Sequence, residues 1–174
     1  MYEGLKISNA FILELVSRWN IQTSSFRIRE HLVPFSLLDV CVVLGLDITG
    51  EQVNLDDSTP GLVNDLFGQE DITVEKILLK LDEEDSVDNY YRLYILLLFA
   101  VFYFPRTSRT VCSFPFNLLD NLECLHMWNW GEAVHSYLVK TLDRASHIFR
   151  QQTNTGGLHL CGCVPVLQVC VNYI

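Results

Sequence analysis

The chain has 174 residues, of which 49% are hydrophobic and 19% charged, and its formal net charge is −9. This length predicts one domain, and the composition is too apolar and too lightly charged for a disordered protein. Thirteen acidic residues against two lysines give residues 47–88 a net charge of −11, which leaves +2 for the rest. Direct nucleic-acid binding is therefore disfavoured, because it normally requires a basic face. The acidic segment is interpreted as a solvated surface.

Apolar residues at helical spacing predict a first helix that is capped by Ser8 and carries Trp19 on its buried face. Two short extended runs follow, at residues 26–28 and 32–35, and they predict a β-hairpin. Pro34 restricts the second run to the edge of a sheet, because proline has no backbone N–H to donate.

Capping signals mark the starts of several further helices. Ser36 and Asp39 match a capping box, and Gly45 suits the left-handed position just after the helix that they open. Later starts are predicted at three positions, with Pro60 in a first turn and Thr73 and Ser86 as N-caps.

Leu93 to Phe104 form an uninterrupted run of twelve apolar residues. A membrane span needs about 20, so this run predicts a buried core helix and no membrane association. Asn129 or Trp130 begins the longest amphipathic stretch, which Gly156 and Gly157 end. A last helix over 166–174 follows Pro165. The sequence thus predicts a mainly α, single globular domain over residues 1–174, with a short β-hairpin near the N-terminus.

The six cysteines do not indicate a secreted disulfide scaffold. The first residues lack the basic and apolar regions of a signal peptide, so a reducing compartment is expected. His159, Cys161 and Cys163 invite a zinc interpretation, but a fourth ligand would have to come from elsewhere in the chain. The candidates for that ligand are Cys170, Cys124 and His126. Buried thiols beside a turn are the favoured alternative.

His126, Asp143, Gln152 and Cys161 occur in the chain order of SUMO-specific cysteine proteases. Only seventeen residues separate Asp143 from Cys161, which leaves no room for the protease core between them. Phosphate-binding glycine motifs are absent, and none of the four lysines indicates a Schiff base. We therefore predict no catalytic residue, no cofactor and no metal site.

Three blocks of the sequence, in this order, resemble the plant mobile domain family, which is also labelled aminotransferase-like. The first block contains Trp19, Phe26, Leu37, Asp39, Val40, Gly45, Leu46 and Gly50. The second block is the segment 91–96, which is similar to the start of the family's central helix. The third block contains Trp130, Gly131, Gly162, Cys163, Leu167 and Gln168. Since Cys170 stands where the family usually has Trp, and the chain stops soon after, a C-terminally truncated copy is expected.

The resemblance implies a non-enzymatic protein-interaction or scaffold domain of transposon origin. Plant mobile domains occur in transposable elements and in host nuclear proteins linked to silencing, genome stability and development, and some associate with a phosphatase-like partner. The resemblance thus implies a nuclear location, and without it the cytosol would be expected. The alternatives are a related transposon-associated domain, linked to SUMO-protease-like cysteine peptidases, and a small zinc-binding module.

Overall fold

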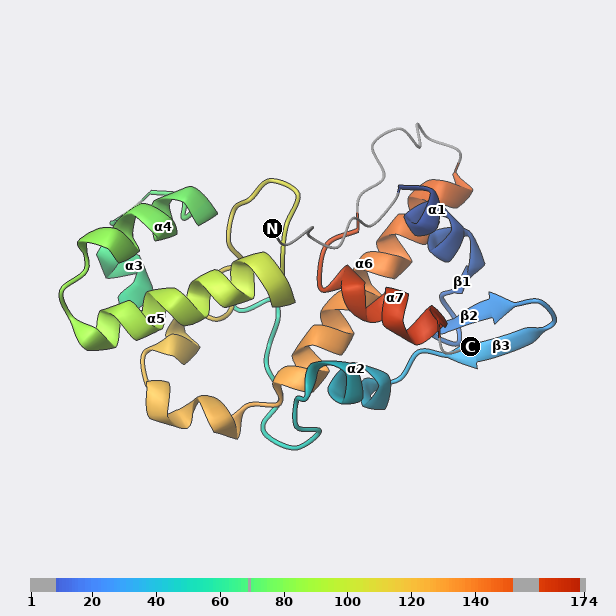
Figure 1. The fold of residues 1–174 in the computed structure, drawn as a ribbon, viewed down its shortest axis with the longest axis horizontal. Coiled ribbons are helices and arrows are strands. Elements are labelled where there is room, and N and C mark those ends of the chain that lie inside the picture. The colour runs from blue at the N-terminus through green and yellow to red at the C-terminus, as the bar shows by residue number, and fades with distance from the viewer. Residues whose placement is uncertain (1–8, 69, 152–159, 173–174) are drawn as a thin grey trace.

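The computed structural model describes residues 9–68, 70–151 and 160–172, and in this part the fold is mainly helical (Figure 1). A three-stranded antiparallel sheet lies near the N-terminus, so the predicted fold class is confirmed. The elements in chain order are α1 (Asn9–Arg18), β1 (Trp19–Asn20), β2 (Ser25–Ile28), β3 (His31–Pro34), α2 (Leu37–Leu44), α3 (Leu62–Phe67), α4 (Val74–Glu83), α5 (Val87–Leu98), the π-helix η1 (Phe99–Tyr103), the 3-10 helices η2 (Asn117–Leu119) and η3 (Leu122–Met127), α6 (Trp130–Arg150) and α7 (Val164–Asn172).

The sheet has the order β1-β2-β3, and β2 and β3 form the predicted hairpin, with Phe26 opposite Val33. Pro34 lies on β3 at the edge, as predicted. The placement of Trp19 on the first helix is wrong, because α1 ends at Arg18 and Trp19 pairs with Phe26 in β1. Burial of the Trp19 ring against Phe26, with ring centroids 4.8 Å apart, outweighs its helical spacing.

Local capping chemistry explains why α2 begins and ends where it does. The Ser36 backbone N–H donates to the Asp39 carboxylate over 2.8 Å, and the Ser36 hydroxyl accepts from the Asp39 N–H. Gly45 closes the helix in the left-handed region, with φ 66°. Thr73 and Ser86 likewise cap α4 and α5, so these three predicted starts are confirmed.

The predicted start at Pro60 is wrong, because α3 begins at Leu62 after the N-cap Gly61. Two long-range contacts fix this start. The Leu62 N–H donates to Asp120 Oδ1 over 2.6 Å, and a Cβ on Gly61 would clash with the carbonyl oxygen of Phe116. Tertiary contacts therefore move the start of the helix beyond the proline.

The apolar run 93–104 is not buried on all sides. It forms the end of α5 and the π-helix η1, and Leu93, Leu96 and Phe104 are buried. Tyr94 is 55% exposed and Val101 is 56% exposed, so the prediction of a buried helix is wrong for this face. Among the described residues, no helix combines the length and apolar character that crossing a membrane requires.

Helix α6 is the centre of one end of the molecule, where α1 and α2 pack against it and α7 packs on α2 (Figure 1). Asn129 caps α6, and the predicted apolar face is buried at Val134, Leu138, Leu142 and Ala145. At the other end, α4 packs on α5. Pro165 lies in the first turn of α7, as predicted. The predicted cap Ser8 and the predicted break at Gly156 and Gly157 lie outside the described residues.

Candidate functional site

Two glycines bring the first and third sequence blocks into direct contact. A Cβ on Gly50 would lie 2.8 Å from the backbone nitrogen of Asn129, just before α6. A Cβ on Gly131 would lie 2.5 Å from Cys41 Sγ and 2.7 Å from the carbonyl oxygen of Asp47. Both positions therefore require glycine, which allows the loop after α2 to pack against the start of α6.

The two tryptophans of the blocks are fixed by hydrogen bonds from their indole nitrogens. Trp19 is 1% exposed and donates to Asp143 Oδ1 over 2.7 Å, which ties β1 to α6. Trp130 is half-buried, donates to the carbonyl oxygen of Leu125 over 2.8 Å and packs on the ring of Phe99. The bond from Trp19 to Asp143 and the packing of Trp130 on Phe99 join segments that are distant in the chain, so both residues stabilise the fold.

The other residues of the first and third blocks also lie in the core or at helix ends. Phe26, Val40, Cys163 and Leu167 are buried, and Leu37, Asp39, Leu46 and Gln168 are half-buried. Gly45 and Gly162 have φ of 66° and 97°, where glycine is favoured. The fold thus brings the sequence blocks together, and the contacts between them are packing interfaces.

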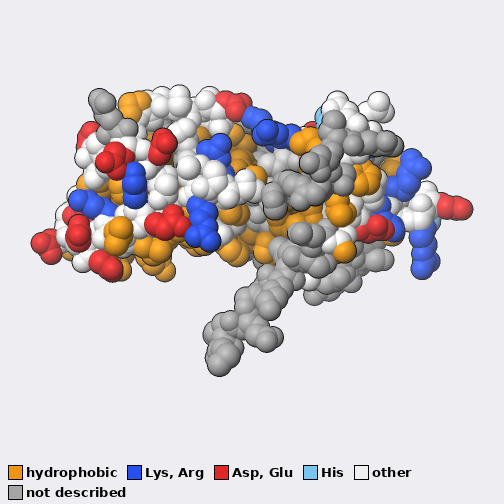
Figure 2. All heavy atoms as spheres, turned by 90° about the horizontal axis from the view of Figure 1, so that it is seen from above, with side chains coloured by type: hydrophobic (Ala, Val, Ile, Leu, Met, Phe, Trp, Pro, Cys, Tyr) orange, Lys and Arg blue, Asp and Glu red, His pale blue; other side chains and the backbone are white. Residues whose placement is uncertain are grey.

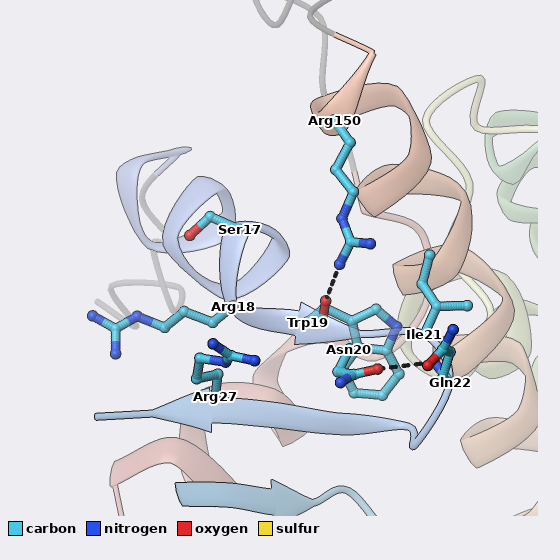
Figure 3. Close-up of a pocket in the computed structure, with 8 residues that line it drawn as sticks. All are labelled: Ser17, Arg18, Trp19, Asn20, Ile21, Gln22, Arg27 and Arg150. Atoms are coloured by element: carbon cyan, nitrogen blue, oxygen red, sulfur yellow. Dashed lines mark hydrogen bonds between the residues drawn. The ribbon is translucent and has the colours of Figure 1, made fainter. Parts of the chain in front are cut away.

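A pocket of about 440 Å³ opens where α1 meets β1, and Figure 3 shows the residues around it. None of the described residues that line it is acidic. Arg150, from the end of α6, donates from Nη2 to the carbonyl oxygen of Trp19 over 2.9 Å. The side chain of Arg27 on β2 forms no hydrogen bond or ion pair with the described residues. Arg18 is ion-paired with Glu14, and its guanidinium points away from the other two (Figure 3).

A second pocket, of about 600 Å³, lies between the segment 106–114 and α6. Arg106, Lys140 and Arg144 contribute to its lining. Lys140 is paired there with Asp56, with Nζ 2.6 Å from Oδ1. Its positive charge is therefore partly neutralised.

The opposite end of the molecule presents an exposed apolar surface along α5 and η1. We define the α5 apolar face as Val87, Tyr91, Tyr94, Leu98, Val101 and Phe102, each of which is more than 40% exposed. From Val87 to Val101 these residues are three or four positions apart, which places them on one side of a helix, and Phe102 adjoins Val101. In Figure 2, hydrophobic side chains gather along the lower edge of this end, with acidic side chains beside them.

Comparison with known proteins places the chain in a family. Residues 3–168 match the family described as a domain of unknown function, DUF8566. The chain belongs to this family. It is also 24% identical, over an alignment of 191 positions, to Protein MAIN-LIKE 1 of Arabidopsis thaliana, a plant mobile domain protein. That match covers 97% of this chain and 36% of MAIN-LIKE 1, so the chain spans little more than a third of that relative. No solved structure matches the chain.

In the structure of this DUF8566 domain, the described candidate protease residues each contact a different group. Asp143 binds the Trp19 indole, and His126 Nδ1 lies 2.8 Å from the carbonyl oxygen of Glu123. Cys161 is joined to α6 through its own carbonyl oxygen, which accepts from the Thr141 hydroxyl. Gln152 lies outside the described residues.

The candidate zinc ligands are only partly described, because His159 lies outside the described residues. Within the part of the chain that the structure describes, no group of three or more His, Cys, Asp or Glu side chains is arranged to hold a metal ion. Burial raises the pKa of the Cys163 thiol to about 11. A thiol with a raised pKa is a weak nucleophile near neutral pH, since the thiolate is the reactive form.

The sequence reasoning missed both surface features of the DUF8566 domain. Arg27 follows the buried Phe26 on a strand, so alternation alone indicates that it faces outward, but nothing local pairs it with Arg150. Tyr91 and Tyr94 do recur at helical spacing. The apolar run from Leu93 to Phe104, which contains Tyr94, concealed this periodicity, because an uninterrupted apolar run has no polar positions that would mark the exposed side of the helix.

Proposed function

We propose that this DUF8566 domain is a non-enzymatic protein-interaction domain of transposon origin, which binds a nuclear protein partner through the α5 apolar face. The observation that carries the proposal is the exposure of large apolar side chains along one side of α5 and η1. Tyr91 and Tyr94 are each 55% exposed and Val101 is 56% exposed.

The composition of the α5 apolar face supports a protein partner. Contiguous exposed apolar patches are uncommon on proteins that act alone, and they frequently mark interaction sites. Tyrosine is enriched at protein interfaces, since its ring gives a large contact area and its hydroxyl keeps a hydrogen bond at the rim. Acidic residues at the start of the helix, including Asp85 and Asp88, give the face a charged border.

The structural contacts made by residues of the sequence blocks support a non-enzymatic role. Gly50, Gly131 and Trp19 serve contacts between segments, and Asp143 is bound to the Trp19 indole. A protease triad would need that carboxylate to orient a histidine beside a thiol. A thiol-reactive ubiquitin-like probe is expected to leave the protein unmodified, and labelling of Cys161 would instead support the peptidase alternative.

The distant similarity to MAIN-LIKE 1 supports the plant mobile domain resemblance, and with it the nuclear location and the links to silencing, genome stability and development. The same resemblance makes a phosphatase-like protein the first partner to test. The proposed nuclear location, biological links and phosphatase-like partner rest on this resemblance, whereas the proposed docking surface rests on the exposure of α5.

The test is a pull-down from plant nuclear extract with three matched forms of the domain. Wild type is expected to recover a discrete protein, and Tyr94→Lys is expected to lose it. Val42→Lys, at a position on α2 that is 74% exposed, introduces the same charge outside the face and should retain the partner. Equal recovery by all three forms, or recovery of no discrete protein by wild type, would contradict the proposal.

A further inference from the structure

The pocket at the junction of α1 and β1 is positively charged in a protein that is acidic overall. Among the described residues, its cations without a carboxylate partner are Arg27 and Arg150, because Arg18, which also lines it, is ion-paired with Glu14. No acidic residue is among the described residues that line it. The net charge of the whole chain is −9. The local positive charge is therefore a feature of how the chain folds, and it does not follow from a basic composition.

The two guanidinium groups come from elements that the rest of the fold holds in place. Trp19 is buried, its indole is bound to Asp143, and its backbone pairs with Phe26, the residue before Arg27. Arg150 is anchored by its bond to the carbonyl oxygen of Trp19. Because that bond uses one N–H, other donors of the Arg150 guanidinium stay available.

Side-chain amides add neutral donors to the lining of the pocket. Asn20 Oδ1 accepts from the Gln22 backbone N–H over 3.0 Å, which orients the Asn20 amide. The Asn20 NH₂ group and the Gln22 side chain both lie beside β1 in the pocket (Figure 3). In the same view the Arg150 side chain extends from the last residue of α6 toward Trp19 on β1.

We propose that this pocket binds a phosphate monoester group. Two guanidinium groups match the charge of a phosphate dianion, and their planar N–H pairs bind phosphate oxygens in bidentate fashion. A volume of about 440 Å³ accommodates a phosphate and the few atoms that carry it. A nucleic acid would need a longer basic track than these residues provide. The phosphate comes either from a phosphorylated protein side chain or from a small free ester.

The test is a titration of the whole chain, followed by amide and indole NMR signals and by calorimetry. The probes are inorganic phosphate, a phosphoserine peptide with its unphosphorylated twin, and a single-stranded oligonucleotide. Phosphate is expected to shift the signals of Trp19, Asn20 and Gln22 in a saturable way. Affinity for the phosphopeptide at least about tenfold above that for phosphate would identify a protein source, and equal affinities would identify a free ester.

Matched variants separate this site from general electrostatics. Arg27→Gln is expected to weaken phosphate binding at least about tenfold, because one charged donor is lost, and to leave thermal stability unchanged. Arg150→Gln should weaken binding equally, with some loss of stability from the bond to Trp19. Arg144→Gln carries the same charge change in the second pocket and should alter affinity less than about twofold.

Three results would overturn the proposal. One is the absence of any saturable shift with phosphate and phosphopeptide. Another is equal weakening of binding by Arg27→Gln and Arg144→Gln, since that would reflect overall charge and not this pocket. The third is tighter binding of the oligonucleotide than of every monoester, with loss in Arg27→Gln, because the ligand would then be a nucleic acid. None of these results depends on whether the α5 apolar face binds a protein.

Discussion

The two ends of the molecule use large aromatic residues in opposite ways. Around α6, Trp19 is 1% exposed and packs with Phe26 and Phe35, whereas on α5 Tyr91 and Tyr94 are each 55% exposed. The first and third sequence blocks pack together at the end of the molecule built around α6, which we call the α6 end. The opposite end, which carries α5, is the α5 end. The difference indicates that these blocks maintain the fold, and that α5 carries a surface which the isolated domain leaves uncovered.

The second sequence block itself is divided between the two roles. Arg92 is 6% exposed and donates from Nε to the carbonyl oxygen of Leu119 over 2.8 Å, so it anchors α5 to η2. Leu93 beside it is fully buried, but Tyr91 and Tyr94 face outward. A single short segment thus holds the helix in place and presents its exposed side.

The largest expected effect is at Trp19, the central aromatic residue of the α6 end. Trp19→Ala should lower the free energy of unfolding by about 3–5 kcal/mol, because it leaves a cavity and removes the donor to Asp143. Equilibrium urea unfolding measures this loss. Trp19→Phe, which keeps most of the ring volume, should cost less. A loss below about 1 kcal/mol for the alanine variant would show that Trp19 is not packed as described.

Gly131→Ala tests the close packing of the two blocks, because we expect it to lower the free energy of unfolding where alanine would ordinarily raise it. Alanine normally stabilises a helix relative to glycine by up to about 1 kcal/mol, but here the new Cβ would meet Cys41 Sγ and the Asp47 carbonyl oxygen. We expect a loss of about 1–3 kcal/mol in urea unfolding. The control is His147→Ala, at an exposed position of the same helix, which should change stability by less than about 0.5 kcal/mol. A stabilising Gly131→Ala variant would contradict the close packing of the two blocks.

Buried thiols at the α6 end predict a loss of stability at alkaline pH. Burial raises the pKa of Cys163 from 9.0 to about 11, so the folded state retains a proton that the unfolded state releases. This contribution is complete below about pH 9 and is lost as the pH rises toward 11. Its size is about 1–2 kcal/mol, measured by urea unfolding at pH 8 and pH 10.5.

Cys163→Ala should reduce this pH dependence without abolishing it, because burial also raises the pKa of Cys170 to about 11. The slope of stability against pH is compared, since the substitution changes packing at every pH. An unchanged slope in Cys163→Ala would show that Cys163 titrates normally in the folded protein.

The smallest effect on stability is expected at the α5 apolar face. Tyr94→Lys and Val101→Lys should each change the free energy of unfolding by less than about 0.5 kcal/mol, since both side chains are more than half exposed. Thermal and urea unfolding of the two variants provide the measurement. A loss of about 2 kcal/mol or more would mean that these side chains are buried in solution, and the two ends would then not differ.

Local chemistry was predictable from the sequence. Ser36 with Asp39, Thr73 and Ser86 cap helices where the sequence predicts them, because a cap depends on residues three apart. The hairpin with Pro34 at its edge was predictable because its two strands follow each other in the chain. These features need no knowledge of distant parts of the chain.

Features that depend on distant contacts were not predictable. The strand β1 forms because Trp19 packs against Phe26 and binds Asp143, and neither contact is visible in helical spacing. The start of α3 depends on Asp120, and the positive pocket depends on Arg150 meeting β1. Each of these contacts joins residues whose separation in the chain gives no periodic signal.

The central claim, that the α5 end is free in the isolated domain and covered in a complex, is tested most directly by hydroxyl-radical footprinting. The measurement compares oxidation of aromatic residues in the domain alone and in the complex recovered from nuclear extract. We expect Tyr91 and Tyr94 to be oxidised in the domain alone and protected in the complex, with Trp19 protected in both. Oxidation of the tyrosines at equal rates in both samples, or their protection in the domain alone, would contradict the account.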